Sequence, residues 1–205
     1  MNALILLETR RVSVEDCLDR HLKYLPADWV PIVICSEQNE DMIGLKKILI
    51  PPINSYKQYL IDYNFLFASA DFYDNFLDYD RILVCHQDSG LLREGIEEFL
   101  EWDYIGAPWK FQQHGGNGGL SLRNPRVMKS ICKIFTYTRS QGNEDVFFSN
   151  IMKQHNIGKL APREECSKFS CETIFQLGTL GYHGIELYSK NQPHTVDEIL
   201  NQYNL

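Results

Sequence analysis

The chain of 205 residues has the composition of an ordinary soluble globular protein, with 44% hydrophobic and 23% charged residues. These values exclude disordered, collagen-like and coiled-coil proteins, and the length predicts a single domain over residues 1–205, since one domain takes about 150 residues. Twenty Lys and Arg against 27 Asp and Glu give a net charge of −7. Because no run of basic residues stands out, we expect no nucleic-acid partner.

The sequence contains no sign of a membrane segment or of an oxidising compartment. Its longest apolar runs, such as residues 3–7, are far shorter than the roughly 20 residues that a membrane span needs. The six cysteines are scattered without a CxxC pair, and most have apolar neighbours, which is typical of small core residues. We therefore expect a cytoplasmic protein without a transmembrane segment, a zinc ribbon or disulfide bonds.

The first half of the chain alternates between strand and helix patterns. Strands are predicted over residues 3–7, 32–35, 47–50 and 81–85, and helices from a capping box at 13–16 to about residue 25, over 56–67 and over 71–77. Strands separated by helices imply parallel βαβ units in an open, doubly wound sheet. In such a sheet, ligands bind beyond the carboxyl ends of the strands.

The second half has a less regular pattern. A helix is predicted over residues 94–100, and a glycine-rich stretch, 115–119, leads into residues 120–123. Asn124 followed by Pro125 is a good helix start. Further helices are predicted near Asn143 and at Thr195, where Glu198 completes a capping box.

The end of the fourth predicted strand carries two candidate metal ligands. His86 and Asp88 lie two residues apart and therefore on the same side of an extended chain. An imidazole and a carboxylate suit Mn²⁺ or a similar ion, which could bridge a diphosphate. For this short segment alone, local hydrogen bonds and a turn cap are the favoured interpretation.

Two further segments allow a chemical interpretation beside a structural one. Glu144 and Asp145 fall in the first turn of a predicted helix, where acids usually only complement the helix dipole, although one of them could act as a general base. The glycine-rich stretch has neither a Walker A signature nor the GxGxxG of a dinucleotide site. Its glycines would let the backbone approach a ligand, or they form a flexible surface turn.

Aromatic and histidine side chains supply the remaining candidates. Trp109 and Tyr104 could form a platform on which a sugar stacks, although core packing is favoured for each of them singly. His183 could be a third metal ligand, although a lone histidine usually is not one.

The order of these segments resembles a family of small glycosyltransferase-like domains, similar in layout to the GT-A class of nucleotide-sugar glycosyltransferases. The resemblance covers roughly residues 50–183, and its most specific blocks are YIGAPW, GNGG-SLR and EDVFF. The segments that carry it are 79–88, 103–109, 116–123, 143–148, 160–162, 169–170 and 181–183. It implies a GT-A-like α/β fold, with an open, mostly parallel, Rossmann-like sheet flanked by helices.

The resemblance also implies a role for each matching residue. Asp88 would end a DxD-like motif that holds the metal and the donor diphosphate, and His183 would complete the metal site. His86 occupies the first acidic position of that motif, which is a departure from the pattern. The remaining implied roles are donor binding by Glu8, Thr9, Arg10, Asn117, Gly118 and Gly119, proton abstraction by Asp145, and acceptor positioning by Glu144.

The implied activity is transfer of a sugar from a nucleotide-diphosphate sugar, most simply a UDP-sugar, to a hydroxyl of a glycan acceptor with inversion. Mn²⁺, or Mg²⁺ in its place, would assist, as in enzymes of polysaccharide biosynthesis. Residues 1–90 would bind the nucleotide, and residues 91–205 would bind the acceptor and catalyse, in a domain that could belong to a longer protein. Two alternatives stay open: a non-catalytic carbohydrate-binding or scaffold domain, which His86 favours, and a sugar nucleotidyltransferase, against which no Gly-rich, basic signature follows the first strand.

Overall fold

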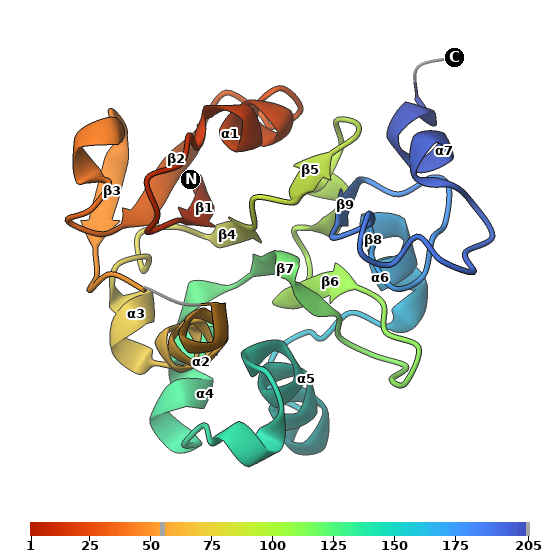
Figure 1. Ribbon diagram of the computed structural model, residues 1–205. Coiled ribbons are helices and arrows are strands. Elements are labelled where there is room, and N and C mark those ends of the chain that lie inside the picture. Colours follow the sequence, from red (N-terminus) through yellow and green to blue (C-terminus); the bar gives the residue numbers. More distant parts are fainter. Residues whose placement is uncertain (54–55, 204–205) are drawn as a thin grey trace.

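A computed structural model describes residues 1–53 and 56–203, without the side chains of residues 56–59 (Figure 1). The strands are β1 (Asn2–Leu7), β2 (Trp29–Cys35), β3 (Lys46–Leu49), β4 (Arg81–Cys85), β5 (Ser89–Leu91), β6 (Tyr104–Ala107), β7 (Asn117–Arg123), β8 (Ser170–Cys171) and β9 (Gly181–His183). The α-helices are α1 (Glu15–Leu22), α2 (Tyr56–Phe67), α3 (Ala70–Asp74), α4 (Pro125–Ile134), α5 (Glu144–His155), α6 (Arg163–Phe169) and α7 (Val196–Asn201). Within the described residues, no helix is both long and apolar enough to cross a membrane.

The main sheet has six strands in the order β3-β2-β1-β4-β7-β6. The first four are parallel, as predicted, whereas β7 runs antiparallel to both β4 and β6. The chain moves outward from β1 to β3 and then returns to β4 on the other side of β1. The strand order therefore reverses between β1 and β4, and open α/β sheets bind their ligands at such a point.

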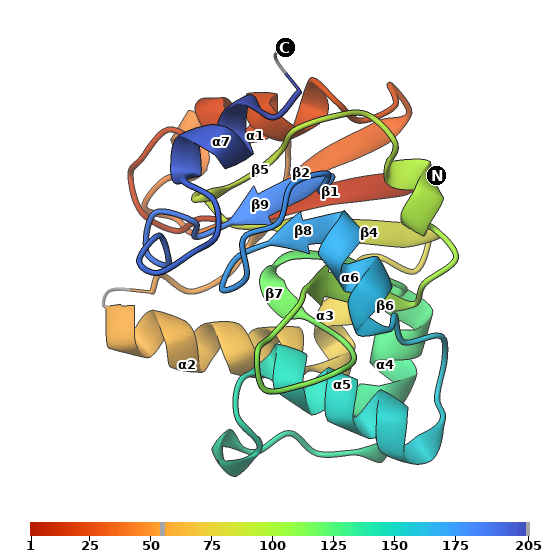
Figure 2. The same cartoon turned by 90° about the vertical axis from the view of Figure 1, so that its right-hand side faces the viewer.

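The sheet is covered on both faces, which explains the continuous apolar sequence of its central strands. Along β1, Ala3, Ile5 and Leu7 pack with residues of α2, α3, α4 and α5. Leu4 and Leu6 point to the other face and pack with α1 and α6. Figures 1 and 2 show the two layers, with α2 to α5 on one side of the sheet and α1 on the other (Figure 2).

Four predicted details of the helices can be compared with the structure. Asn124 caps α4 by accepting hydrogen bonds from the backbone of the next turn, and Thr195 and Glu198 form the predicted capping box of α7. The predicted capping box at residues 13–16 is wrong, because the Ser13 hydroxyl accepts from the amide of Glu15, two residues on, in a local turn. The helix predicted over 94–100 is also wrong, since only a 3₁₀ turn over Ile96–Phe99 forms there, after a left-handed Gly95.

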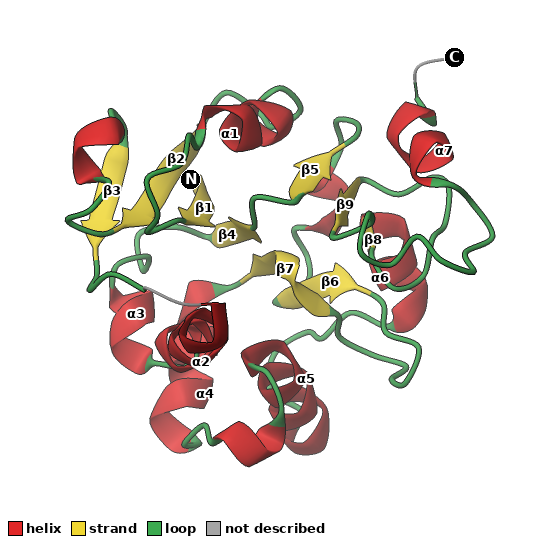
Figure 3. Ribbon diagram, viewed as in Figure 1, coloured by secondary structure: helices red, strands yellow, loops and turns green. Residues whose placement is uncertain are grey.

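A second, small sheet of order β5-β9-β8 lies beside the main sheet, and Figure 3 shows its three short arrows near α6 (Figure 3). Ser89 of β5 is paired with His183 of β9, so the small sheet brings His183 to the loop that follows β4. The strands β5, β8 and β9, which have two or three residues each, were not predicted because they are too short to show a period. All six cysteines are free thiols, and five of them are buried, as the sequence predicted.

Candidate active site

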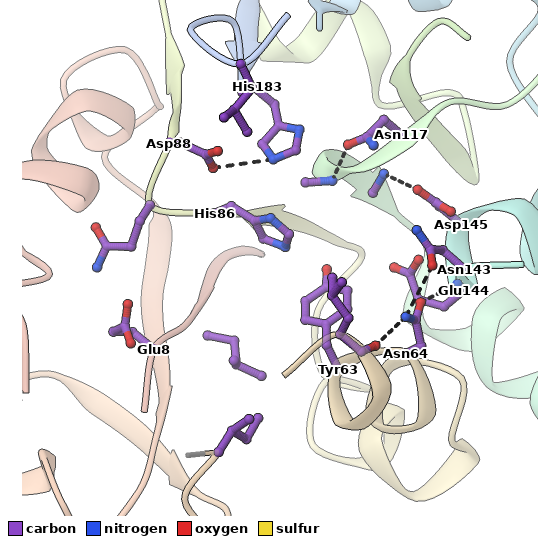
Figure 4. A pocket seen from close by; sticks show the side chains of 18 of the residues that line it. Glu8, Tyr63, Asn64, His86, Asp88, Asn117, Asn143, Glu144, Asp145 and His183 are labelled. Atoms are coloured by element: carbon purple, nitrogen blue, oxygen red, sulfur yellow. Dashed lines mark hydrogen bonds and ion pairs between the residues drawn. The ribbon is translucent and has the colours of Figure 1, made fainter. Parts of the chain in front are cut away.

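A cavity of about 810 Å³ opens where the strand order reverses. Its walls come from the carboxyl ends of β1 and β4, the first residues of β7 and α5, one side of α2, and β9 with the loop that follows it. Most of the predicted site residues line it, namely Glu8, Arg10, His86, Asp88, Asn117, Gly118, Gly119, Glu144, Asp145 and His183. Figure 4 shows two separated groups among them, with His86, Asp88 and His183 on one wall and Glu144 and Asp145 on the other (Figure 4).

The first wall brings three possible metal ligands together. One ligand atom from each of His86, Asp88 and His183 lies within 4.8 Å of the others. His183 is held between two carboxylates, with Nε2 3.4 Å from Asp88 Oδ1 and Nδ1 3.1 Å from Glu172 Oε1. Although burial lowers it, the pKa of His183 rises to about 9 because these two carboxylates stabilise the imidazolium. Burial raises the pKa of Asp88, but the bond to His183 outweighs burial and brings this pKa down to about 2.

His86 carries a nitrogen that is ready to bind a ligand. Its Nε2 atom is buried and has no hydrogen-bond partner among the described residues. Burial, together with the nearby His183, lowers the pKa of His86 to about 3, so the ring is neutral and keeps a free lone pair. An unpartnered imidazole nitrogen beside a carboxylate and a second imidazole is a donor set for a divalent metal ion. These residues therefore fit a divalent cation of the kind that the sequence resemblance implies.

The glycines of β7 allow the two walls to come close. A Cβ atom on Gly119 would lie 2.2 Å from His183 Nε2, and one on Gly118 would lie 2.8 Å from Glu144 Oε1. Any larger residue would therefore displace a side chain of the site. The side chain of Asn117 bonds this backbone directly, since its Oδ1 accepts from the amide of Gly119 at 2.8 Å. Residues 117–119 are thus part of a strand, and the alternative of a flexible surface turn is wrong for them.

The second wall holds two adjacent carboxylates in different environments. Glu144 is ion-paired with the fully buried Arg123, whose Nη2 lies 2.6 Å from Glu144 Oε1. Asp145 has no such cation among the described residues, and it accepts hydrogen bonds from the amides of Gly118 at 2.9 Å and Val146 at 2.7 Å. Burial and the neighbouring Glu144 raise the pKa of Asp145 to about 7. A carboxyl with such a pKa can take up and release a proton near neutral pH.

The start of α5 is capped from another helix. Asn143 was predicted as the cap, but its side chain makes no capping hydrogen bond. Asn64 of α2 caps the helix instead, because its Oδ1 accepts a hydrogen bond from the amide of Glu144 at 2.6 Å. This bond fixes the first turn of α5, and with it both carboxylates, against α2.

The end of β1 contributes a charged pair. Glu8 is buried, and both of its carboxylate oxygens accept from Arg10, at 2.8 Å from Nε and 2.6 Å from Nη2. Both residues line the cavity, as predicted. Thr9 does not line it, because Thr9 is buried and its carbonyl oxygen accepts from the Ser36 hydroxyl at 3.0 Å. Thr9 therefore supports the loop and offers no side chain to a ligand.

The predicted sugar platform is wrong. Tyr104 is fully buried in β6, and its hydroxyl donates to the carbonyl oxygen of Gly116 at 2.9 Å. Trp109 is 5% exposed and stacks on Phe111 outside the cavity, with 5.3 Å between ring centroids. Both rings are buried by packing, so neither offers a face to a sugar in the cavity. Among the side chains that the structure describes, those of Tyr63 and Tyr188 line the cavity.

Sequence reasoning missed Arg123, Asn64 and Glu172 as parts of the site. The sequence contained a signal for Arg123, since a charged residue at the end of the stretch 120–122 has to find a partner when the strand is buried. Asn64 and Glu172 had none, because Asn64 reaches α5 across 80 residues and Glu172 meets His183 through the pairing of β8 with β9.

Comparison with known proteins supports the interpretation of the fold. The structure is similar to the apo-form glycosyltransferase GlyE of Streptococcus pneumoniae TIGR4, with a TM-score of 0.52 and 12% identity over 100% of this chain and 60% of that chain. Mouse xyloside xylosyltransferase 1 in its apo form also matches, with a TM-score of 0.47 and 12% identity over 90% of this chain and 98% of that one. This chain thus spans about 60% of the length of the GlyE chain. The likeness to GlyE confirms the predicted GT-A-like fold.

Comparison at the level of sequence gives the family. No curated protein matches this sequence. A family model does match, over residues 52–183, which is more than half of the chain. That segment includes β4, β7, the start of α5 and β9, and so most of the residues that line the cavity. The chain therefore belongs to the family described as "Protein of unknown function (DUF5672)".

Proposed function

We propose that this protein is a glycosyltransferase that moves a sugar from a nucleotide-diphosphate sugar to a hydroxyl of a glycan acceptor. The observation that carries the proposal is the pairing of two walls in one cavity. One wall holds a carboxylate with a pKa near 7, and the other holds three ligands suited to a divalent cation. The cavity lies where open α/β sheets bind nucleotides.

The donor would lie along the wall formed by β1 and β4. Glu8 and Arg10 stand at the end of β1, where the nucleoside of a UDP-sugar would bind, and Arg10 keeps a cationic group at the cavity although it is paired with Glu8. His86, Asp88 and His183 would hold Mn²⁺ or Mg²⁺. When bound, such an ion neutralises the charge that collects on the departing diphosphate. Asn117, Gly118 and Gly119 would face the donor sugar.

Asp145 would serve as the general base. Its ionised carboxylate would take the proton of an acceptor hydroxyl while the oxygen forms a bond to the anomeric carbon. The bond from that carbon to the diphosphate oxygen breaks, and its electron pair leaves with the diphosphate. Attack from the face opposite the leaving group inverts the anomeric configuration. Glu144, held in place by its ion pair with Arg123, would accept a hydrogen bond from the acceptor and so orient it.

This assignment divides one domain, residues 1–205, into a nucleotide-binding half over 1–90 and an acceptor and catalytic half over 91–205. We also propose that this domain belongs to a larger protein with further domains, because the GlyE chain is longer. That larger protein would act in polysaccharide biosynthesis.

One observation favours a second function, a carbohydrate-binding or scaffold domain without turnover. His86 stands where the related motif has an acid, and a neutral imidazole contributes no negative charge to a cation site. Such a domain would bind a nucleotide or a glycan and release no product.

A thermal unfolding experiment with UDP, GDP, dTDP and CMP, each with and without Mn²⁺, tests the proposal. We expect one nucleotide to raise the unfolding temperature only when Mn²⁺ is present, since a ligand at 100 times its Kd adds about 2.7 kcal/mol. Release of that nucleotide from its sugar donor in the presence of glycan acceptors then separates an enzyme from a binding domain. Binding without any release would favour the second function, and no binding of any nucleotide would contradict both the donor and the cation assignments.

A further inference from the structure

A second group of metal-binding side chains lies on the other face of the main sheet. Cys17 and His21 are four residues apart on α1 and therefore share one face of the helix. Cys85, the last residue of β4, points toward them, whereas the next residue, His86, lines the cavity. One ligand atom from each of Cys17, His21 and Cys85 lies within 4.8 Å of the others, and all three residues are 0% exposed.

The Cys17 thiol has two possible acceptors, the sulfur of Cys85 and the carbonyl oxygen of His86. The carbonyl oxygen of His86 receives three donors, namely the amide of Ser89 at 3.1 Å, the hydroxyl of Ser89 at 2.8 Å and the thiol of Cys17 at 3.3 Å. A carbonyl oxygen has only two lone pairs. The contact from Cys17 is the longest of the three, so the carbonyl oxygen keeps its two shorter bonds from Ser89 when the thiol is deprotonated.

The imidazole of His21 offers a lone pair on Nε2. Its Nδ1 lies 2.6 Å from the carbonyl oxygen of Cys17, which can only accept, so Nδ1 carries the hydrogen. In the neutral ring, Nε2 then bears a lone pair and faces the Ser89 hydroxyl at 3.1 Å. The single hydrogen of that hydroxyl has two acceptors within reach, this lone pair and the His86 carbonyl oxygen at 2.8 Å, so the His86 carbonyl can take it when Nε2 binds an ion.

We propose that Cys17, His21 and Cys85 bind a structural zinc ion. The two thiols would bind as thiolates and release their protons to solvent, and the His86 carbonyl would keep its bonds from Ser89. The lone pair of His21 Nε2 would bind the ion, while Nδ1–H keeps its bond to the Cys17 carbonyl, as metal-bound histidines commonly do. Two sulfurs and an imidazole are ligands that zinc prefers. The Ser89 hydroxyl oxygen lies beside His21 and could take the fourth position. Two thiolates also neutralise the charge of Zn²⁺ in this buried place.

The ion would tie α1 to the end of β4, next to the loop that carries His86 and Asp88. This site is separate from the cavity and does not depend on the proposed transferase activity. Its ligands are sulfur and nitrogen, whereas the cavity offers imidazoles and a carboxylate, so the two sites select different ions.

The experiment measures zinc in the full chain purified from zinc-supplemented cells and dialysed against a weak chelator. We expect one equivalent of zinc per wild-type chain and its loss in Cys17→Ala and in Cys85→Ala. Cys35→Ala is the matched control, because Cys35 is an equally buried thiol in the same apolar cluster but lies outside the group. Since the two site variants could fail to fold, wild-type protein loaded with Co²⁺ provides a second readout, the thiolate-to-cobalt charge-transfer absorption.

Three results would overturn the proposal. The first is wild-type protein without zinc and without the cobalt–thiolate absorption. The second is a disulfide between Cys17 and Cys85 in protein purified under reducing conditions. The third is zinc that is retained in Cys17→Ala and Cys85→Ala but lost in Asp88→Asn, which would place the ion in the cavity. None of these results bears on nucleotide binding by the wild-type protein, so the zinc site and the proposed function can fail separately.

Discussion

The two walls of the cavity differ in how their charged side chains are paired. On the wall of His86, Asp88 and His183, two acids enclose an imidazolium, and the half-exposed Asp88 is ionised far below neutral pH. On the opposite wall, two buried carboxylates lie near one buried arginine, and the arginine pairs with only one of them. The partners of Asp145 in the described part of the chain are backbone amides, and burial together with Glu144 raises its pKa to about 7.

The difference shows that two neighbouring residues of one helix can have separate chemistry when a single fixed cation lies next to only one of them. Glu144 and Asp145 are adjacent and equally buried. Arg123 lies against Glu144, and therefore Asp145 is the carboxyl that titrates near neutral pH.

The largest expected effect is on the rate. Asp145→Asn removes the proposed base, and we expect the turnover rate to fall by about 10²–10⁴ because general-base catalysis is worth that much. Nucleotide binding should stay as in the wild type, since Asp145 stands on the wall away from the cation ligands. Steady-state kinetics and a nucleotide titration check both expectations, and a variant that transfers sugar at the wild-type rate would assign the base to another residue.

Next in size is the stability cost of breaking the buried ion pair. Arg123→Met leaves Glu144 buried and without its cation, and we expect the free energy of unfolding to fall by about 3–5 kcal/mol. Arg93→Met is the matched control, because Arg93 pairs with the more exposed Glu98 and should lose less than about 1 kcal/mol. Urea unfolding of both variants measures the two losses in the free energy of unfolding. Equal losses would mean that burial does not make the Arg123–Glu144 pair contribute more to stability than the exposed pair.

A smaller change is expected from the support of His183. Glu172→Gln keeps the size of the side chain but removes the charge that holds the imidazole, and we expect the affinity for Mn²⁺ to fall by about 10–100-fold. Calorimetric titration with Mn²⁺ measures this without any turnover. Glu186→Gln, a carboxylate outside the cavity lining, should bind Mn²⁺ as the wild type does. Unchanged affinity in Glu172→Gln would show that this carboxylate does not position a metal ligand.

The mildest test uses pH. A carboxyl with a raised pKa is protonated below that pKa, so the rate should rise with pH up to about 7 and fall roughly tenfold per unit below it. Stability should change in the opposite direction, because between the ordinary pKa of 3.8 and about 7 the folded state holds a proton that the unfolded state has lost. Asp145 therefore lowers the free energy of unfolding as pH rises through this range, whereas His86, whose pKa falls from 6.5 to about 3 on folding, raises it up to about pH 6.5. The difference in the free energy of unfolding between the wild type and Asp145→Asn isolates the Asp145 contribution, and an identical pH dependence in both would assign the raised pKa to another group.

The sequence by itself determined the parallel half of the sheet, the helix starts at Asn124 and Thr195, and the two segments that carry most of the site. Continuous apolar strands, caps and turn residues act within a few positions of the chain, so they are visible in a linear pattern. His86 and Asp88 follow a predicted strand end, and Glu144 and Asp145 follow a predicted helix start, so both walls were placed at the right elements.

Only the tertiary structure decided which of these groups meet and what charge each one carries. Arg123 reaches Glu144 across 21 residues, and Glu172 reaches His183 through a pairing of strands too short to predict. The same distant packing buried Tyr104 and Trp109, and it brought Cys17 and His21 to Cys85. Burial and charge pairing depend on neighbours from several elements at once, and a local pattern holds no information about them.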